Sequence, residues 1–263
     1  TREFKDAIKA KPDYGEAYLA LGAVYVQAGR YKDALEKFNK ALKLDKHLAV
    51  EAHYNLGIAY SKQGDIKTAV KHYKEAILIN PKSALPQLHL GIIYMKEEKY
   101  EDAVLCLHTA VKLSSRVASE GFFKLGFALT KLERYEDAVE PLKEALKINP
   151  NNDLALEALG DSFYRTFESW GKIKTVKERV DFLKNALQYV PAQPQCQKAL
   201  GEIYDSVMDG VNAVIHTTIA QLVYTEQKKK KEADATLTYL AMLYKKHNLN
   251  SKDFSTVKIP RKK

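Results

Sequence analysis

Apolar residues recur three, four and seven positions apart through most of the chain, as in amphipathic helices that bury one face. Within this pattern a leucine–glycine pair returns at nearly constant spacing. Its glycines are Gly22, Gly57, Gly91, Gly126, Gly160 and Gly201. The intervals between them are 35, 34, 35, 34 and 41 residues. The pattern therefore predicts a row of similar helical units that stack on their neighbours.

Other positions keep the same register in the first four complete units. Twelve and nineteen residues after the glycine stand alanines, and sixteen after it stands a large apolar residue. These positions hold Ala34, Phe38, Ala41, Ala69, Tyr73, Ala76, Ala103, Leu107, Ala110, Ala138, Leu142 and Ala145. The pattern resembles the tetratricopeptide repeat (TPR), a 34-residue helix–turn–helix unit. The resemblance implies an all-α fold: a right-handed TPR superhelix (α-solenoid) of about six and a half helix-turn-helix repeats with a C-terminal capping helix.

The register divides the chain into segments. The 41-residue interval after Gly160 makes the fifth complete repeat longer than the others. Its extra residues are expected at 164–177, between the two helices of that repeat. The second helix of the last repeat is expected to run through Gln227 into the lysines that follow it. In the capping helix, Leu237, Leu240 and Tyr244 should share one face. The predicted array spans 1–227, with a partial repeat 1–14, repeats 15–49, 50–83, 84–118, 119–152, 153–193 and 194–227, then a capping helix 228–247 and a basic tail 248–263.

Charge is concentrated at the C-terminal end. The net charge is +9, and residues 226–263 carry eleven Lys/Arg against four Asp/Glu, which leaves +2 for the rest. No apolar run approaches the roughly 20 residues that span a bilayer. Two cysteines, Cys106 and Cys196, form neither a disulfide framework nor a metal motif. We therefore expect a helical protein of the cytoplasm without a membrane span, with cytoskeletal or ciliary association left open.

In proteins of the TPR type, the first helix of each repeat lines a groove, and the resemblance transfers those positions to this chain. The fifth and ninth positions of four successive repeats form two apolar rows. The thirteenth position places lysines at the rim. The predicted partner groove comprises Leu19, Ala23, Tyr54, Asn55, Ile58, Leu88, His89, Ile92, Phe123, Lys124 and Phe127, with the basic rim Lys62, Lys96 and Lys131.

The fifth- and ninth-position rows are expected to be free of the repeat core, which other positions fill. An apolar groove with basic rim favours a protein partner: an amphipathic helix, or a peptide with acidic flanks. The alternative is that the rows are covered by inter-unit packing or by another part of the protein itself. A homo-oligomer also stays open.

The Hsp70/Hsp90 carboxylate-tail clamp found in one class of TPR domain is not expected. That clamp needs lysine, asparagine and further basic groups around a terminal carboxylate. Only Asn55 matches, because Leu19, Ala23, Leu85 and His89 occupy the other positions. A carboxylate buried there would lack its cations.

No catalytic chemistry emerges from the motifs. The chain lacks HExxH, GxxxxGK[ST], GxGxxG and GxSxG. His53 holds a position usual for a packed aromatic residue. We therefore expect no enzyme, no cofactor and no metal, and a scaffold or adaptor in a macromolecular complex.

Two further features are secondary candidates for contact. Trp170, the single tryptophan, either anchors a partner or pins its own loop. The run Lys228, Lys229, Lys230 and Lys231 either meets an acidic surface or is a solvated helix end. One alternative function is thus a structural subunit of a cytoskeletal, ciliary or transport complex, held by its ends and basic C-terminus. A weaker one is RNA binding through that end, although nucleic acid is not the favoured partner because the run lacks interleaved aromatics.

Overall fold

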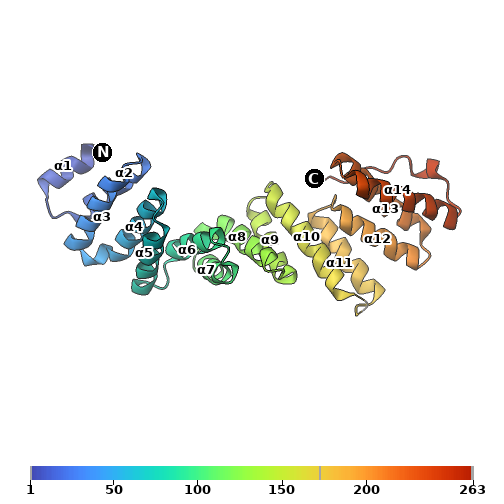
Figure 1. Cartoon of the computed structure of the whole chain (residues 1–263), viewed down its shortest axis with the longest axis horizontal. Coiled ribbons are helices and arrows are strands. Elements are labelled where there is room, and N and C mark those ends of the chain that lie inside the picture. The colour runs from blue at the N-terminus through green and yellow to red at the C-terminus, as the bar shows by residue number, and fades with distance from the viewer. Residues whose placement is uncertain (1, 172, 262–263) are drawn as a thin grey trace. The chain divides into compact units, whose positions relative to one another are not determined.

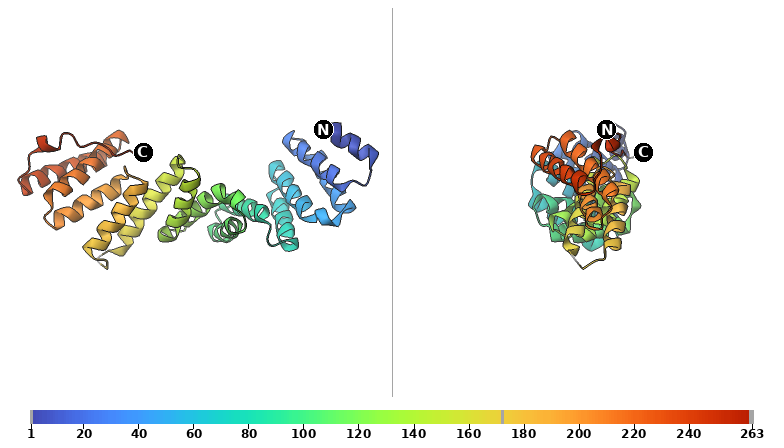
Figure 2. Two further views of the ribbon diagram at one scale, coloured as in Figure 1. Left: turned by 180° about the vertical axis from the view of Figure 1, so that it is seen from behind. Right: turned by 90° about the vertical axis from the view of Figure 1, so that its right-hand side faces the viewer.

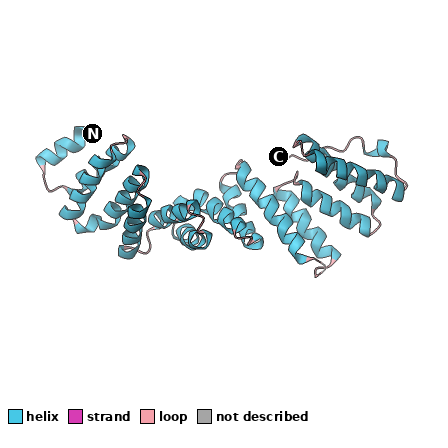
Figure 3. Cartoon of the chain, viewed as in Figure 1, coloured by secondary structure: helices cyan, strands magenta, loops and turns pink. Residues whose placement is uncertain are grey.

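The computed structural model describes residues 2–171 and 173–261, and every regular element in them is helical (Figures 1 and 3). This confirms the all-α prediction. The chain divides into two compact units, Thr1–Ala128 and Leu129–Lys263. Within each unit, helices that follow one another in sequence lie side by side, as views from the front and from behind both show (Figures 1 and 2).

The first unit begins with a single helix and continues with antiparallel helix pairs. Its helices are α1 (Arg2–Ala10), α2 (Gly15–Gln27), α3 (Tyr31–Leu44), α4 (Ala49–Gln63), α5 (Ile66–Ile79), α6 (Ala84–Lys96), α7 (Tyr100–Leu113) and α8 (Ala118–Lys131), the last of which ends in the second unit. Two short 3-10 turns each precede the first helix of a repeat: η1 (Lys46–Leu48) precedes α4, and η2 (Ser115–Val117) precedes α8.

The repeating glycine is the place where two helices of a pair approach most closely. A Cβ atom built on Gly22 would lie 2.5 Å from Cε1 of Phe38, far below any real contact. Phe38 is fully buried there. At the turn between α4 and α5, Gly64 has φ +94°, a left-handed conformation that favours glycine. A side chain at Gly22 would hold the two helices apart, and one at Gly64 would strain the turn.

The second unit adds longer helices. Its helices are α9 (Tyr135–Ile148), α10 (Asp153–Trp170), α11 (Val176–Tyr189), α12 (Pro194–Ser206), α13 (Gly210–Glu226) and α14 (Lys230–Lys246), followed by the 3-10 turn η3 (Ser251–Phe254).

The extra residues of the fifth repeat do not form the expected insertion between helices. Most of them extend α10 through Trp170. The extension is helical because Phe163 and Phe167, one turn apart, both bury their rings. Trp170 then packs on Phe182 of α11, with ring centroids 4.3 Å apart. The extra residues are thus mainly a continuation of α10, which adds Thr166 and Phe167 to the core.

The lysine run also differs from its prediction. We expected α13 to continue into the lysines, but α13 ends at Glu226. Lys228 takes a left-handed φ of 58°, and the Lys229 amide donates to the Tyr224 carbonyl at 2.9 Å. These contacts close the helix end, so the lysines occupy a turn and the start of α14.

The capping helix α14 packs on α13, as expected, and one of the three residues predicted to face α13 points elsewhere. Leu240 is buried and Tyr244 packs against the same core cluster, as predicted, whereas Leu237 is 56% exposed and was wrongly placed on this face. The segment that follows turns back onto α14. Phe254 packs on Tyr244, with ring centroids 5.9 Å apart. The tail is therefore packed in part against the cap.

Candidate functional site

The first helices of successive repeats meet in the first unit, and they carry the predicted groove. Tyr54 on α4 contacts His89 on α6 edge-on, with ring centroids 5.4 Å apart. His89 in turn stacks on Tyr73 at 5.7 Å. The structure thus brings these groove positions together into an aromatic floor that crosses from one repeat to the next.

The groove side chains are shared between this face and the repeat core. Leu88 is only 4% exposed and lies within reach of Gly121 on α8. Leu19, Tyr54 and Ile58 pack against core clusters. The expectation that the rows are free of the core was therefore wrong for these four. The positions that remain half-buried are Leu19, Ala23, Tyr54, Asn55, Ile58, His89, Ile92, Phe123, Lys124 and Phe127.

The polar groups of the predicted groove are held by their own helices. The Asn55 side-chain amide donates to the Glu51 carbonyl at 2.9 Å. Lys124 pairs with Glu120 at 3.5 Å. The rim lysines Lys62, Lys96 and Lys131 are exposed. The predicted groove positions therefore combine mainly apolar, half-buried side chains with exposed lysines at the predicted rim.

Burial sets the protonation of the aromatic floor. It raises the pKa of Tyr54, and the neighbouring Arg116 opposes that shift while Glu120 adds to it. Burial lowers the pKa of His89; Glu120 opposes this effect and Lys62 reinforces it. Both side chains are therefore neutral at pH 7, which suits contact with an apolar partner.

Three of the other histidines pack against neighbouring side chains. Nδ1 of His53 lies 3.0 Å from Nδ1 of His72, and the His72 ring stacks on Tyr60. Burial lowers the pKa of His53 and of His72, and the charge of His53 lowers the pKa of His72 further. Nδ1 of His216 lies 2.6 Å from the Gln197 side-chain oxygen, and burial lowers the pKa of His216 to about 4. The packing role expected of His53 agrees with these contacts.

These histidines make stability sensitive to acid. Their pKa values are lower in the folded chain than the value of about 6.5 in the unfolded chain, so the unfolded chain binds more protons below that pH. The free energy of unfolding should fall as pH drops from 6.5 towards 4 and be insensitive to these groups above pH 7. Urea denaturation at several pH values measures it. His216→Gln should flatten the acid slope, and an unchanged slope would contradict the assignment.

The secondary candidates are placed as follows. Trp170 is half-buried between Phe182 and the Lys174 ammonium group, which lies 5.6 Å from its ring centroid. These contacts fit the role of pinning its own loop. Lys228–Lys231 are all exposed, around the first turn of α14.

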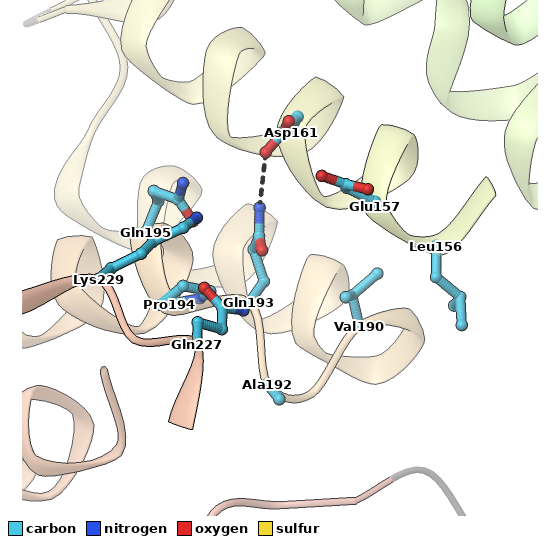
Figure 4. Close-up of a pocket in the computed structure, with 10 residues that line it drawn as sticks. All are labelled: Leu156, Glu157, Asp161, Val190, Ala192, Gln193, Pro194, Gln195, Gln227 and Lys229. Atoms are coloured by element: carbon cyan, nitrogen blue, oxygen red, sulfur yellow. Dashed lines mark hydrogen bonds between the residues drawn. The ribbon is translucent and has the colours of Figure 1, made fainter. Parts of the chain in front are cut away.

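One cleft was missed by the sequence reasoning. It lies in the second unit, where Glu157 and Asp161 of α10 face the connection before α12 (Figure 4). These two residues hold the fifth and ninth positions of their repeat, the positions that carry the apolar rows in the earlier repeats. The signal was therefore present as a change from apolar to acidic residues at equivalent positions.

The described residues hold neither the arrangement of a metal site nor a helix suited to a bilayer. No cluster of three or more histidine, cysteine or acidic side chains there has the arrangement of a metal site. None of the described helices combines the length and the apolar character that crossing a bilayer requires.

Comparison with known families and proteins agrees with the geometry. The tetratricopeptide repeat model matches residues 50–83, and a further TPR repeat model matches 24–64 and 126–166. The C-terminal part of a TPR repeat-containing protein from Cytophaga hutchinsonii has a similar fold, with a TM-score of 0.56 at 14% identity. That similarity covers 98% of this chain and 93% of the other.

The names of two similar proteins describe different roles, one in assembly and one in catalysis. Photosystem I assembly protein Ycf3 of Prochlorococcus marinus is 32% identical over 91 residues, which cover 34% of this chain and 53% of that protein. Human protein O-mannosyl-transferase TMTC3 is 27% identical over 129 residues, or 47% of this chain and 14% of that protein. The match therefore spans only part of each relative.

Proposed function

Because this chain belongs to the tetratricopeptide repeat proteins, we propose that it is a non-catalytic scaffold or adaptor that binds a partner protein. The observation that carries the proposal is the aromatic floor of the first unit. There Tyr54 and His89 connect two repeats, and Ile92 and Phe123 add half-buried apolar surface. Neutral aromatic surface of this kind gains free energy when a partner covers it.

The charge around this surface supports a particular kind of partner. Lys62 and Lys96 are exposed at the ends of α4 and α6, beside an apolar centre. An amphipathic helix, or a peptide with an apolar centre and acidic flanks, matches both features. The name of the relative Ycf3, an assembly protein, supports a role in assembling other proteins. The transferase shares only 14% of its length with this chain and gives no support for catalysis here.

A random peptide library displayed on phage and selected on the intact chain tests this function. Enriched peptides should carry apolar residues at helical spacing, flanked by Asp or Glu. The variant Ile92→Gln/Phe123→Gln should weaken their binding at least about tenfold, because it removes apolar surface from the floor. Fluorescence anisotropy of the labelled peptides measures the dissociation constants.

The matched control is Leu78→Gln/Leu105→Gln. These leucines are 76% and 68% exposed and lie on the second helices α5 and α7. The control removes comparable apolar surface outside the predicted groove and should bind as the parent chain does. Equal binding by the Ile92/Phe123 variant, with helix content preserved by circular dichroism, would refute the groove as the binding surface.

A further inference from the structure

The cleft of the second unit has features that the proposed function of the first unit does not use. Its volume is about 570 Å³, within the range of ligand pockets. Its walls are α10, the connection that leads into α12, and the turn between α13 and α14 (Figure 4). The lining residues are Leu156, Glu157, Asp161, Val190, Ala192, Gln193, Pro194, Gln195, Gln227 and Lys229.

Two carboxylates stand on one wall. Glu157 and Asp161 are one helical turn apart on α10, so their Cβ atoms are about 5–6 Å apart. Both are exposed, and in the part of the chain that the structure describes neither forms an ion pair. Like charges at this spacing repel, which a cation bound between them would relieve.

Asp161 is held in place by a buried amide. Nε2 of Gln193 donates to Oδ1 of Asp161 at 3.1 Å, and Gln193 is only 9% exposed. Gln193 fits because residue 160 is glycine: a Cβ there would lie 2.8 Å from Cδ of Gln193. The bond leaves Oδ2 of Asp161 for a ligand. The carboxylate is therefore oriented before any ligand arrives.

The wall opposite the two carboxylates carries polar groups that can form hydrogen bonds with the backbone of a peptide ligand. Oε1 of Gln195 is buried without a hydrogen-bond donor among the described residues, which is an unfavourable state for a polar atom. Rotation of this amide towards the cleft would let it accept an N–H group from a ligand. Lys229, on the same side (Figure 4), can donate to a carbonyl oxygen. An extended peptide carries both groups.

We propose that this cleft binds an arginine side chain of an extended segment of a partner protein. The planar guanidinium group donates to Glu157 and to the free oxygen of Asp161, a geometry that fits two carboxylates better than a compact ammonium group does. Leu156 and Val190 pack the aliphatic stem. Gln195 and Lys229 bind the peptide backbone.

The test is a nuclear magnetic resonance titration of the full chain carrying ¹⁵N-labelled glutamine. The probe is the peptide acetyl-Gly-Ala-Arg-Ala-Gly-amide, and its reference is the same peptide with citrulline, which keeps the shape but lacks the charge. Side-chain amide signals of Gln193 and Gln195 should shift with the arginine peptide. The citrulline peptide should bind about tenfold more weakly or not at all.

Variants separate this site from general charge attraction. Glu157→Gln/Asp161→Asn should weaken binding of the arginine peptide about tenfold. Glu136→Gln/Asp181→Asn, which removes the same charge from exposed positions on α9 and α11, should leave it unchanged. Gln193→Met tests the positioning of Asp161. This variant should weaken binding of the arginine peptide and leave the weak binding of the citrulline peptide unchanged.

Three results would each overturn the proposal. They are equal binding of the two peptides, equal weakening by both double variants, and absence of shifts at about 10 mM arginine peptide. Circular dichroism establishes that each variant keeps its helices. The outcome is independent of the groove of the first unit, because the Ile92→Gln/Phe123→Gln variant should bind the arginine peptide as the parent chain does.

Discussion

Replacement of Phe38 by alanine should lower the free energy of unfolding by about 3–5 kcal/mol, the range for deleting a fully buried phenylalanine ring. Phe38 has no exposed surface, and it fills the space between α2 and α3 over Gly22. Leu21, Tyr25 and Leu56 share its cluster, so the cavity would reach from one repeat into the next. Urea denaturation followed by circular dichroism measures the loss.

Two comparisons make this expectation specific. Leu78→Ala, at a side chain 76% exposed, should change the free energy of unfolding by less than about 0.5 kcal/mol. Hydrogen exchange in Phe38→Ala should accelerate most in α2, α3 and α4, because each repeat is stabilised mainly by its neighbours. A loss below about 1 kcal/mol for Phe38→Ala would contradict the close packing of this pair.

Replacement of Asp205 by alanine should destabilise the capping helix by about 2–4 kcal/mol. The Asp205 carboxylate accepts hydrogen bonds from the Tyr239 hydroxyl at 3.0 Å, and from Lys246 Nζ and His247 Nε2 at 2.7 Å each. The substitution leaves the His247 ring, 6% exposed, without its acceptor. Hydrogen exchange in α14 should therefore accelerate more than exchange elsewhere in the second unit.

The stabilisation that Asp205 and its three hydrogen-bond donors provide depends on pH, because it requires the charged carboxylate. Burial opposes ionisation of Asp205, but hydrogen bonds from Lys246, His247 and Tyr239 outweigh it and hold its pKa below the ordinary value. The stabilisation is thus present above the pKa of the unfolded carboxyl group and lost as pH falls through the lower folded value. Asp181→Ala, at an exposed position of α11, is the control and should leave α14 exchange unchanged.

The order of the helices was predictable because the repeat imposes steric demands on single positions. Gly22 must lack a side chain under Phe38, and Ala34 must be small where the helices of the pair approach each other. Such demands recur at each repeat and appear directly as sequence spacing. The candidate groove was predictable only as a set of positions, since periodicity reports which face of a helix is covered and not how much of it.

Neighbouring helices decided how much of the side chain at each groove position is exposed. Leu88 stands in the same repeat position as Leu19, yet it is 4% exposed while Leu19 is half-buried, because α8 packs over it at Gly121. The same effect explains α10, whose extra turns were expected to lie between the two helices of their repeat. The residues after Tyr164 continue the helix because Phe167 is buried and the Trp170 ring packs on Phe182 of α11.

The sequence by itself determined the helical class and the repeat period, because those depend on spacing along one chain. Only the tertiary structure decided the sites that join distant residues. Gln193 reaches Asp161 across 32 positions, and His247 reaches Asp205 across 42. Hydrogen bonds of this kind depend on how one repeat lies against the next, and no local pattern of apolar and polar residues encodes them.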